Sequence, residues 1–82
     1  MATSIDELSV IRSLQAGDRE SFEELVRQYR PGLLAAARRS TINETAAEDA
    51  VQETFLRAYR NLRRLADDSR LGPWLYRILA NV

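Results

Sequence analysis

The residues with the most evident chemistry lie in the last third of the chain, where arginines are interleaved with aromatic side chains. Residues 57–82 contain six arginines and two acidic residues, a net charge of +4, whereas residues 1–56 contain six arginines and ten acidic residues, a net charge of −4. Arginine neutralises phosphate and an aromatic ring receives an unstacked base, so this composition favours single-stranded nucleic acid. Arginines near a helix C-terminus also complement its dipole, and Trp74 equally suits the core of a short helix. The set is Arg60, Arg63, Arg64, Arg70, Trp74, Tyr76 and Arg77.

A second candidate surface lies on a segment whose residues fall on two opposite helical faces. At about 100° per residue, an apolar stripe forms one face and a mainly polar set forms the other. The apolar stripe is Ala47, Val51, Phe55, Ala58 and Leu62, and the polar set is Asp49, Gln52, Glu53, Leu56 and Arg60. An apolar anchor ringed by polar groups suits the docking of a partner helix. Single exposed leucines are also common, so Leu56 alone does not decide between docking and an ordinary solvated face.

The composition excludes several classes of chemistry. The 82 residues include no cysteine and no histidine, which rules out disulfides, zinc sites, and thiol or imidazole catalysis. The chain offers no plausible pairing of nucleophile and base, so we predict no enzyme, no catalytic residue, no metal and no cofactor. No apolar run approaches the ~18 residues that a membrane span needs, and Met1 begins no signal-peptide pattern. We therefore expect one cytoplasmic domain without a membrane or small-molecule partner.

The elements that must position these residues are all expected to be helices. Ser4 and Glu7 form a capping-box pattern, and Gly17 marks the end of the first helix. Asp18 is the N-cap candidate for the second helix, which is expected to run to about residue 39. Pro31 interrupts its apolar pattern, and the sequence leaves open whether the proline kinks or breaks the helix.

The second half of the chain predicts two more helices. After a polar linker over residues 40–45, Thr45 and Glu48 form another capping-box pattern that opens the longest helix, over residues 46–64. Residues 66–69 form an acidic loop, and Pro73 suits the first turn of a last helix that begins near residues 72–73. The predicted fold class is all-α, a compact bundle of four helices.

Three segments of the chain resemble region 2 of bacterial extracytoplasmic-function (ECF) sigma factors, members of the sigma-70 family. Residues 47–62 (AEDAVQETFLRAYRNL) are similar to the family's core-binding helix. Residues 74–78 (WLYRI), followed by Ala80 and Asn81, resemble the start of its −10 recognition helix, and residues 15–26 (QAGDRESFEELV) resemble its opening helices. The resemblance spans about residues 7–82 in order.

The resemblance implies a transcription initiation module with two binding surfaces. The opening helices would be about residues 5–40, the core-binding helix 45–65, a base-capturing loop 66–72 and a truncated −10 recognition helix 73–82. The core-binding helix would dock on the β′ clamp helices of core RNA polymerase through Asp49, Gln52, Glu53, Leu56 and Arg60. The implied contacts with the non-template −10 strand are Arg63, Arg64, Leu65, Asp67, Asp68, Ser69, Arg70, Trp74, Arg77 and Asn81. Capture of unstacked bases would help to melt the promoter, and an anti-sigma factor would be a further partner.

Three departures from the family pattern favour an alternative function. Leu65 stands where the family usually has Phe, and Gly72-Pro73 replaces a pair that is usually compatible with helix. The chain also ends at Val82, within the expected recognition helix, so we expect a fragment of a longer sigma factor. The alternative is a helical interaction domain that binds core polymerase or an anti-sigma factor without reading DNA.

Overall fold

The chain folds into four α-helices and one short 3-10 turn over the residues that the structure describes. This computed structural model describes residues 4–66 and 70–82, with the backbone alone for residues 4–6. The elements in chain order are α1 (Ser4–Gln15), α2 (Arg19–Arg38), α3 (Glu44–Arg60), η1 (Leu62–Arg64) and α4 (Leu71–Ala80). No strand occurs in this described part, and the all-α prediction is confirmed.

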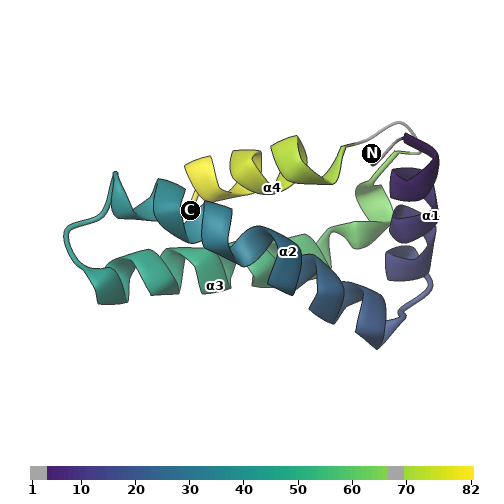
Figure 1. Ribbon diagram of the computed structural model, residues 1–82, viewed down its shortest axis with the longest axis horizontal. Helices are drawn as coiled ribbons and strands as arrows, with labels where there is room; N and C mark the ends of the chain where they lie inside the picture. The colour runs from purple at the N-terminus through teal and green to yellow at the C-terminus, as the bar shows by residue number, and fades with distance from the viewer. Residues whose placement is uncertain (1–3, 67–69) are drawn as a thin grey trace.

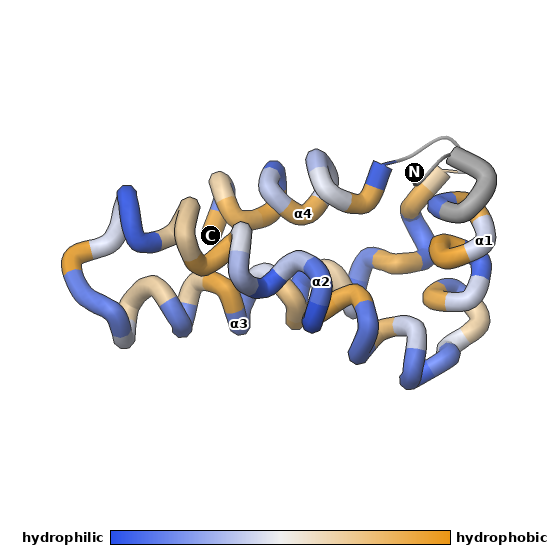
Figure 2. The backbone as a smooth tube through the Cα atoms, viewed as in Figure 1, coloured by the Kyte–Doolittle hydropathy of each residue, from blue (hydrophilic) through white to orange (hydrophobic). Residues whose placement is uncertain are grey.

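The two longest helices, α2 and α3, form an antiparallel pair on which the other two pack. Figure 1 shows α4 returning along this pair, while α1 stands across the end opposite the α2–α3 turn. In Figure 2 the hydrophobic segments of α4 turn toward α2 and α3, and hydrophilic segments line the outer edges. No helix in residues 4–66 or 70–82 is long and apolar enough to cross a membrane.

The predicted apolar stripe of α3 forms the centre of the core. All five of its residues, Ala47, Val51, Phe55, Ala58 and Leu62, are buried. The sequence did not identify Thr54, which is fully buried beside them. Its hydroxyl donates a 2.8 Å hydrogen bond to the Ala50 carbonyl one turn earlier, which satisfies the hydroxyl inside the core.

The turn between α1 and α2 follows the sequence prediction closely. Gly17 adopts φ +87°, a conformation that favours glycine. Its amide donates to the Leu14 carbonyl and the Asp18 amide donates to the Ser13 carbonyl, which is the Schellman pattern at a helix end. The Asp18 carboxylate then caps α2 by accepting from the Glu20 amide at 3.1 Å. Gly17 therefore ends α1 and Asp18 caps α2, as the sequence predicted.

The joint between α2 and α3 is capped by a residue other than the one expected. Asn43 is the N-cap, and its side-chain oxygen accepts from the Ala46 amide at 2.8 Å. The prediction that Thr45 caps this helix is therefore wrong, because Thr45 lies inside the first turn and Asn43 caps equally well. The Arg38 guanidinium also donates two 2.8 Å hydrogen bonds to the Glu44 carboxylate, which joins the two helix ends.

Pro31 lies inside α2, which continues across it without a break. This region of α2 crosses α4 through two tyrosine–glycine pairs. A Cβ at Gly32 would overlap the Tyr76 hydroxyl, and a Cβ at Gly72 would lie 3.3 Å from Cε1 of Tyr29. Glycine at both positions therefore lets each helix approach the other's tyrosine closely.

Helix α3 ends earlier than predicted, at Arg60 instead of Arg64. The Asn61 side-chain amide turns back and donates to the Arg57 carbonyl at 2.8 Å, which caps the end of the helix. The chain then tightens into η1, which carries Arg63 and Arg64. The predicted single helix over residues 46–64 is thus an α-helix followed by a 3-10 turn.

Helix α4 begins at Leu71, one to two residues before the predicted start. Pro73 is its third residue, where a missing N–H costs no internal hydrogen bond. The N-cap residue Arg70 makes no side-chain cap, and the Glu7 carboxylate accepts from the Leu71 amide at 3.2 Å instead. Glu7 was predicted to cap its own helix with Ser4, whose side chain lies outside the described part of the structure.

Candidate functional site

Three of the five residues predicted for polymerase docking meet at one groove on the surface of α3. Asp49, Gln52 and Leu56 line a groove of about 430 Å³ between α2 and α3. All three are exposed, with Leu56 at 44%. An apolar side chain at this exposure, between an acidic and an amide group, gives the groove a mixed surface suited to a helical partner.

Aromatic residues from both helices form the floor and one rim of this groove. Phe22 of α2 packs edge-on against Phe55, with 6.4 Å between ring centroids, and against Tyr59 at 5.4 Å. Tyr59 remains 63% exposed beside Leu56, and Arg30 of α2 lines the opposite side. Neither Tyr59 nor Arg30 was predicted for the site: Tyr59 lies one turn beyond Leu56 on α3, outside the predicted polar set, and Arg30 reaches the groove only through the packing of α2 on α3.

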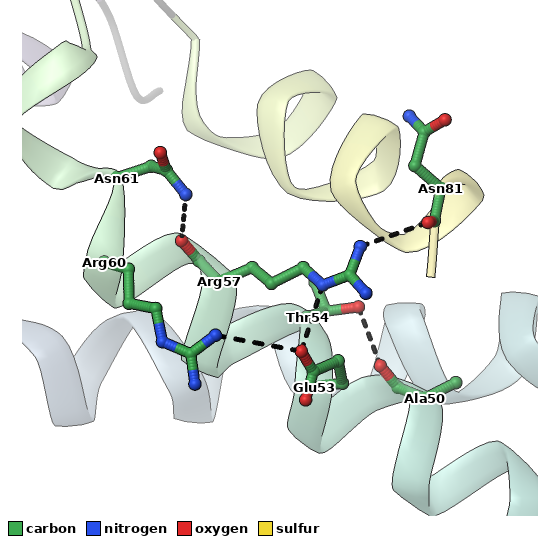
Figure 3. Close-up of polar contacts among 7 residues, drawn as sticks. All are labelled: Ala50, Glu53, Thr54, Arg57, Arg60, Asn61 and Asn81. Carbon is green, nitrogen blue, oxygen red and sulfur yellow. Dashed lines mark hydrogen bonds and ion pairs between the residues drawn. The ribbon is translucent and has the colours of Figure 1, made fainter.

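The other two predicted docking residues take part in a polar network on the adjacent side of α3. The Glu53 carboxylate accepts from Nε of Arg57 at 3.0 Å and lies 4.0 Å from a guanidinium nitrogen of Arg60. Arg57 also donates to the backbone carbonyl of Asn81 at 3.1 Å, as Figure 3 shows. Arg57 therefore links the docking face of α3 to the C-terminal end of α4, a role that its sequence position alone did not reveal.

Two arginines and the tryptophan lie around one shallow hollow along α4 and the residue that precedes it. Arg70, Pro73, Trp74 and Arg77 line a shallow hollow of about 310 Å³. Both arginines are exposed, whereas Trp74 is half-buried and packs against the core. The tryptophan thus packs partly against the core, and its remaining surface lines the hollow with the two arginines, so its contact with DNA stays a prediction.

Apart from Asn81, the remaining residues predicted for DNA contact fall into three groups. Arg63 and Arg64 are exposed on η1, whereas Leu65 is 7% exposed and packs in the core. Because its side chain is buried, Leu65 offers no surface to a base. Burial of this apolar side chain instead stabilises the end of η1. Asp67, Asp68 and Ser69 lie outside the described residues.

Asn81 is the C-cap of α4, as well as one of the predicted DNA contacts. Its side-chain amide donates to the Arg77 carbonyl at 2.9 Å, while its own carbonyl accepts from Arg57. The residue is exposed and lies one turn beyond Arg77. Its amide group therefore closes the last turn of the helix in this conformation.

The electrostatic environment near the start of α4 is shaped by burial and by an acidic neighbour. Burial is the main factor that raises the pKa of the Tyr29 hydroxyl above its ordinary value, and the Glu7 carboxylate raises it further. Tyr29 lies over Gly72, so Glu7 approaches both the α2–α4 crossing and the first amide of α4.

Comparisons with known proteins give one consistent family. The family model described as Sigma-70 region 2 matches residues 25–82. The chain is 35% identical over 81 residues to the RNA polymerase sigma-H factor of Pseudomonas aeruginosa, a match that covers 99% of the chain and 42% of that protein. It is 37% identical over 78 residues to the RNA polymerase sigma factor NccH of Alcaligenes xylosoxydans xylosoxydans, covering 95% of the chain and 41% of that protein.

A third relative is named as an ECF sigma factor. The ECF RNA polymerase sigma factor SigW of Bacillus subtilis is 33% identical over 72 residues, covering 88% of the chain and 38% of that protein. The chain thus spans about two fifths of the length of these relatives. No solved structure matches it.

Proposed function

The chain belongs to the sigma-70 family as a region 2 domain of the ECF group, and from this premise we propose that it is a transcription initiation module. In this proposal the domain binds core RNA polymerase through the α2–α3 groove and the −10 promoter strand through α4 and η1. It supplies binding and positioning, and no catalytic residue of its own.

The observation that carries the proposal is the separation of two chemically different surfaces on one helical framework. The groove at Leu56 is apolar and flanked by Asp49 and Gln52. The hollow along α4 combines Arg70 and Arg77 with a half-buried tryptophan. A protein partner and a nucleic acid can therefore occupy the domain together, as a sigma factor requires.

The docking surface would act mainly through Leu56 and its aromatic neighbour Tyr59. An exposed leucine in a groove buries apolar area when a partner helix packs on it, which is the usual source of hot-spot energy. Asp49 and Gln52 would set the register of the partner by hydrogen bonds at the rim. We assign the β′ clamp helices as that partner, with an anti-sigma factor competing for the same groove.

The DNA surface would combine phosphate binding with stacking. Arg63 and Arg64 on η1, together with Arg70 at the N-cap of α4 and Arg77 on α4, would neutralise phosphates and orient the strand without reading its sequence. The exposed part of Trp74 would stack on an unpaired base, and base capture by the predicted loop over residues 66–72 would supply sequence discrimination. The cost of unstacking, a few kcal/mol, means that the domain would act on DNA that the polymerase is already opening.

Binding of single-stranded DNA in the presence of core polymerase tests this function. We expect the protein that carries this domain to bind −10-like oligonucleotides more tightly than scrambled ones in fluorescence anisotropy. Arg70→Ala should weaken binding to every sequence and reduce the salt slope by about 0.7, the contribution of one phosphate on a single strand. Arg27→Ala, which removes an exposed α2 arginine paired with Glu24, is the charge-matched control and should change neither quantity.

The alternative function predicts a different result in the same assay. A domain that only docks on polymerase would bind both classes of oligonucleotide equally, and Arg70→Ala would leave the salt slope unchanged.

Docking on polymerase is tested by Leu56→Asp. A charge placed in the middle of an apolar contact should weaken binding to a β′ clamp-helix fragment by at least ~2 kcal/mol, the scale of an interface hot spot. Circular dichroism should remain unchanged, because Leu56 is exposed on α3. Equal affinity of the variant and the parent would contradict the assignment of the groove.

A further inference from the structure

Helix α1 carries no residue assigned to either binding surface, yet its side chains hold both ends of the segment that joins η1 to α4. At the first end, Nε2 of Gln15 donates to the Leu62 carbonyl at 2.8 Å and to the Leu65 carbonyl at 3.0 Å. An amide NH₂ has two protons, so one side chain can satisfy both carbonyls. The Leu62 carbonyl also accepts the 3-10 hydrogen bond from the Leu65 amide at 3.2 Å, and the Leu65 carbonyl lies just past the end of η1.

At the other end, Glu7 acts as the cap that α4 lacks locally. Arg70 occupies the N-cap position, but its side chain has no acceptor and makes no cap. The Glu7 carboxylate accepts from the Leu71 amide at 3.2 Å, across 64 residues of sequence. A carboxylate at a helix N-terminus also interacts favourably with the helix dipole.

The two polar residues share one face of α1 with the residues that anchor it. Ile11 and Leu14, which lie between them on this face, are almost completely buried. Eight residues separate Glu7 from Gln15, which corresponds to about 12 Å along a helix. Because its apolar side chains are fixed in the core, α1 can hold the end of η1 and the start of α4 at a set separation.

We propose that Glu7 and Gln15 are positioning residues for promoter recognition. They fix η1, with Arg63 and Arg64, relative to the start of α4, with Arg70, and so determine which base lies between the phosphate-binding arginines. This inference rests on the proposed DNA-binding function and extends it to a helix that makes no DNA contact. Sequence discrimination is then a property of α1 as much as of α4.

The proposal separates two measurable quantities. Phosphate contacts depend on the presence of the arginines, so loss of Glu7 or Gln15 should leave the salt slope of DNA binding unchanged. Base discrimination depends on how the two groups of arginines are placed, so it should fall. The net contribution of one hydrogen bond corresponds to about threefold to tenfold in an equilibrium, and we expect a loss of discrimination of at least this size for each variant.

The experiment compares variants of the full-length protein that carries this domain, assembled with core polymerase. Gln15→Ala, Glu7→Ala and the conservative Glu7→Gln are measured against single-stranded oligonucleotides that vary at each −10 position, over a salt series. Ser9→Ala, an exposed substitution on the same helix, is the matched control. Affinity for core polymerase and thermal midpoint are recorded for every variant, so that loss of folding is recognised separately.

The expected result is reduced discrimination in both alanine variants, with salt slope and core affinity at parental values. Glu7→Gln should recover most of the discrimination, because its amide oxygen still accepts from the Leu71 amide. Parental discrimination in folded Gln15→Ala and Glu7→Ala proteins would overturn the inference alone. Absence of discrimination in the parent would instead overturn the proposed function.

Discussion

The α2–α3 joint and the α3–α4 joint are built in different ways. At the α2–α3 joint the polar contacts between described residues are local: Asn43 caps α3 and Arg38 pairs with Glu44, six residues away. At the α3–α4 joint Asn61 caps the end of α3 locally, but the side-chain contacts at η1 and at the start of α4 come from a helix at the other end of the chain, through Gln15 and Glu7. The first joint is specified by its own residues, whereas the second requires that α1 has already packed.

This difference coincides with the division of proposed functions. The α2–α3 pair forms the groove proposed for polymerase, and its geometry is maintained by local caps and a continuous core. The arginines proposed for DNA lie on both sides of the α3–α4 joint. The docking groove lies on two helices whose joint is stabilised by its own residues. The DNA surface requires two groups of arginines at a fixed separation, and a third helix, α1, can fix that separation by contacting both sides of the joint.

The largest expected effect comes from Phe55→Ala, which removes a central side chain of the hydrophobic core around α3, the helix that both joints share. Phe55 is buried and contacts Phe22 across the α2–α3 interface. The substitution should destabilise the protein by about 3–5 kcal/mol. Because α3 takes part in both joints, we expect both to be lost in one cooperative transition in thermal unfolding followed by circular dichroism.

The matched control is Tyr59→Ala, which removes the other aromatic partner of Phe22 from an exposed position. It should cost about 1 kcal/mol. Similar losses of stability for Phe55→Ala and Tyr59→Ala would show that the core is not centred on α3. The two joints could then not be compared as attachments to one common core.

Sequence reasoning predicted the features that depend on neighbouring residues. The five apolar positions of α3 repeat at helical spacing and are all buried. Gly17 and Asp18 also follow local rules, since a left-handed glycine and a carboxylate cap need only adjacent amides. The fold class and the exposed face around Leu56 follow from the same periodicity.

The missed features depend on residues that meet only after folding. Glu7 has the spacing of a cap for its own helix, yet its carboxylate reaches the amide of Leu71. Thr54 is polar in sequence but buried, because its hydroxyl is satisfied one turn away. The groove likewise requires α2 to place Phe22 beside Tyr59, which no single-helix pattern contains.

A second prediction compares the two joints directly through Gln15→Ala and Asn43→Ala. Gln15→Ala leaves two partly buried carbonyls without this donor and should cost about 1–3 kcal/mol. Asn43→Ala removes an exposed helix cap and should cost about 1 kcal/mol. Hydrogen exchange separates them by location: Gln15→Ala should accelerate exchange at the amides of Leu65 and Leu71, and Asn43→Ala at the first turn of α3.

The comparison fails if Gln15→Ala and Asn43→Ala accelerate exchange at the same amides. That result would mean that the two joints open as one unit and that α1 has no specific role at the second.

The smallest expected effect concerns the ion pair that closes the local joint. The hydrogen bonds from Arg38 are the main factor that lowers the pKa of the Glu44 carboxyl below its ordinary value. A lowered pKa in the folded state means that the pair stabilises the protein above the ordinary pKa of a glutamate and is lost as the pH falls through the lowered value. Glu44→Gln should therefore be slightly less stable than the parent at pH 7, and the two should converge once the pH has fallen below the lowered pKa of Glu44.

The measurement is the urea midpoint of both proteins over this pH range, at low and at high salt. Both side chains of the pair are about half exposed, so 1 M salt should remove most of the difference. Glu24→Gln, which breaks a more exposed pair within α2, is the control for a contact that joins no elements, and it should shift the midpoint less. If the parent and Glu44→Gln lose stability in parallel as the pH falls, the pair contributes nothing at the joint. The α2–α3 joint would then be maintained by Asn43 and the apolar core, and its contrast with the α1-dependent joint would rest on capping alone.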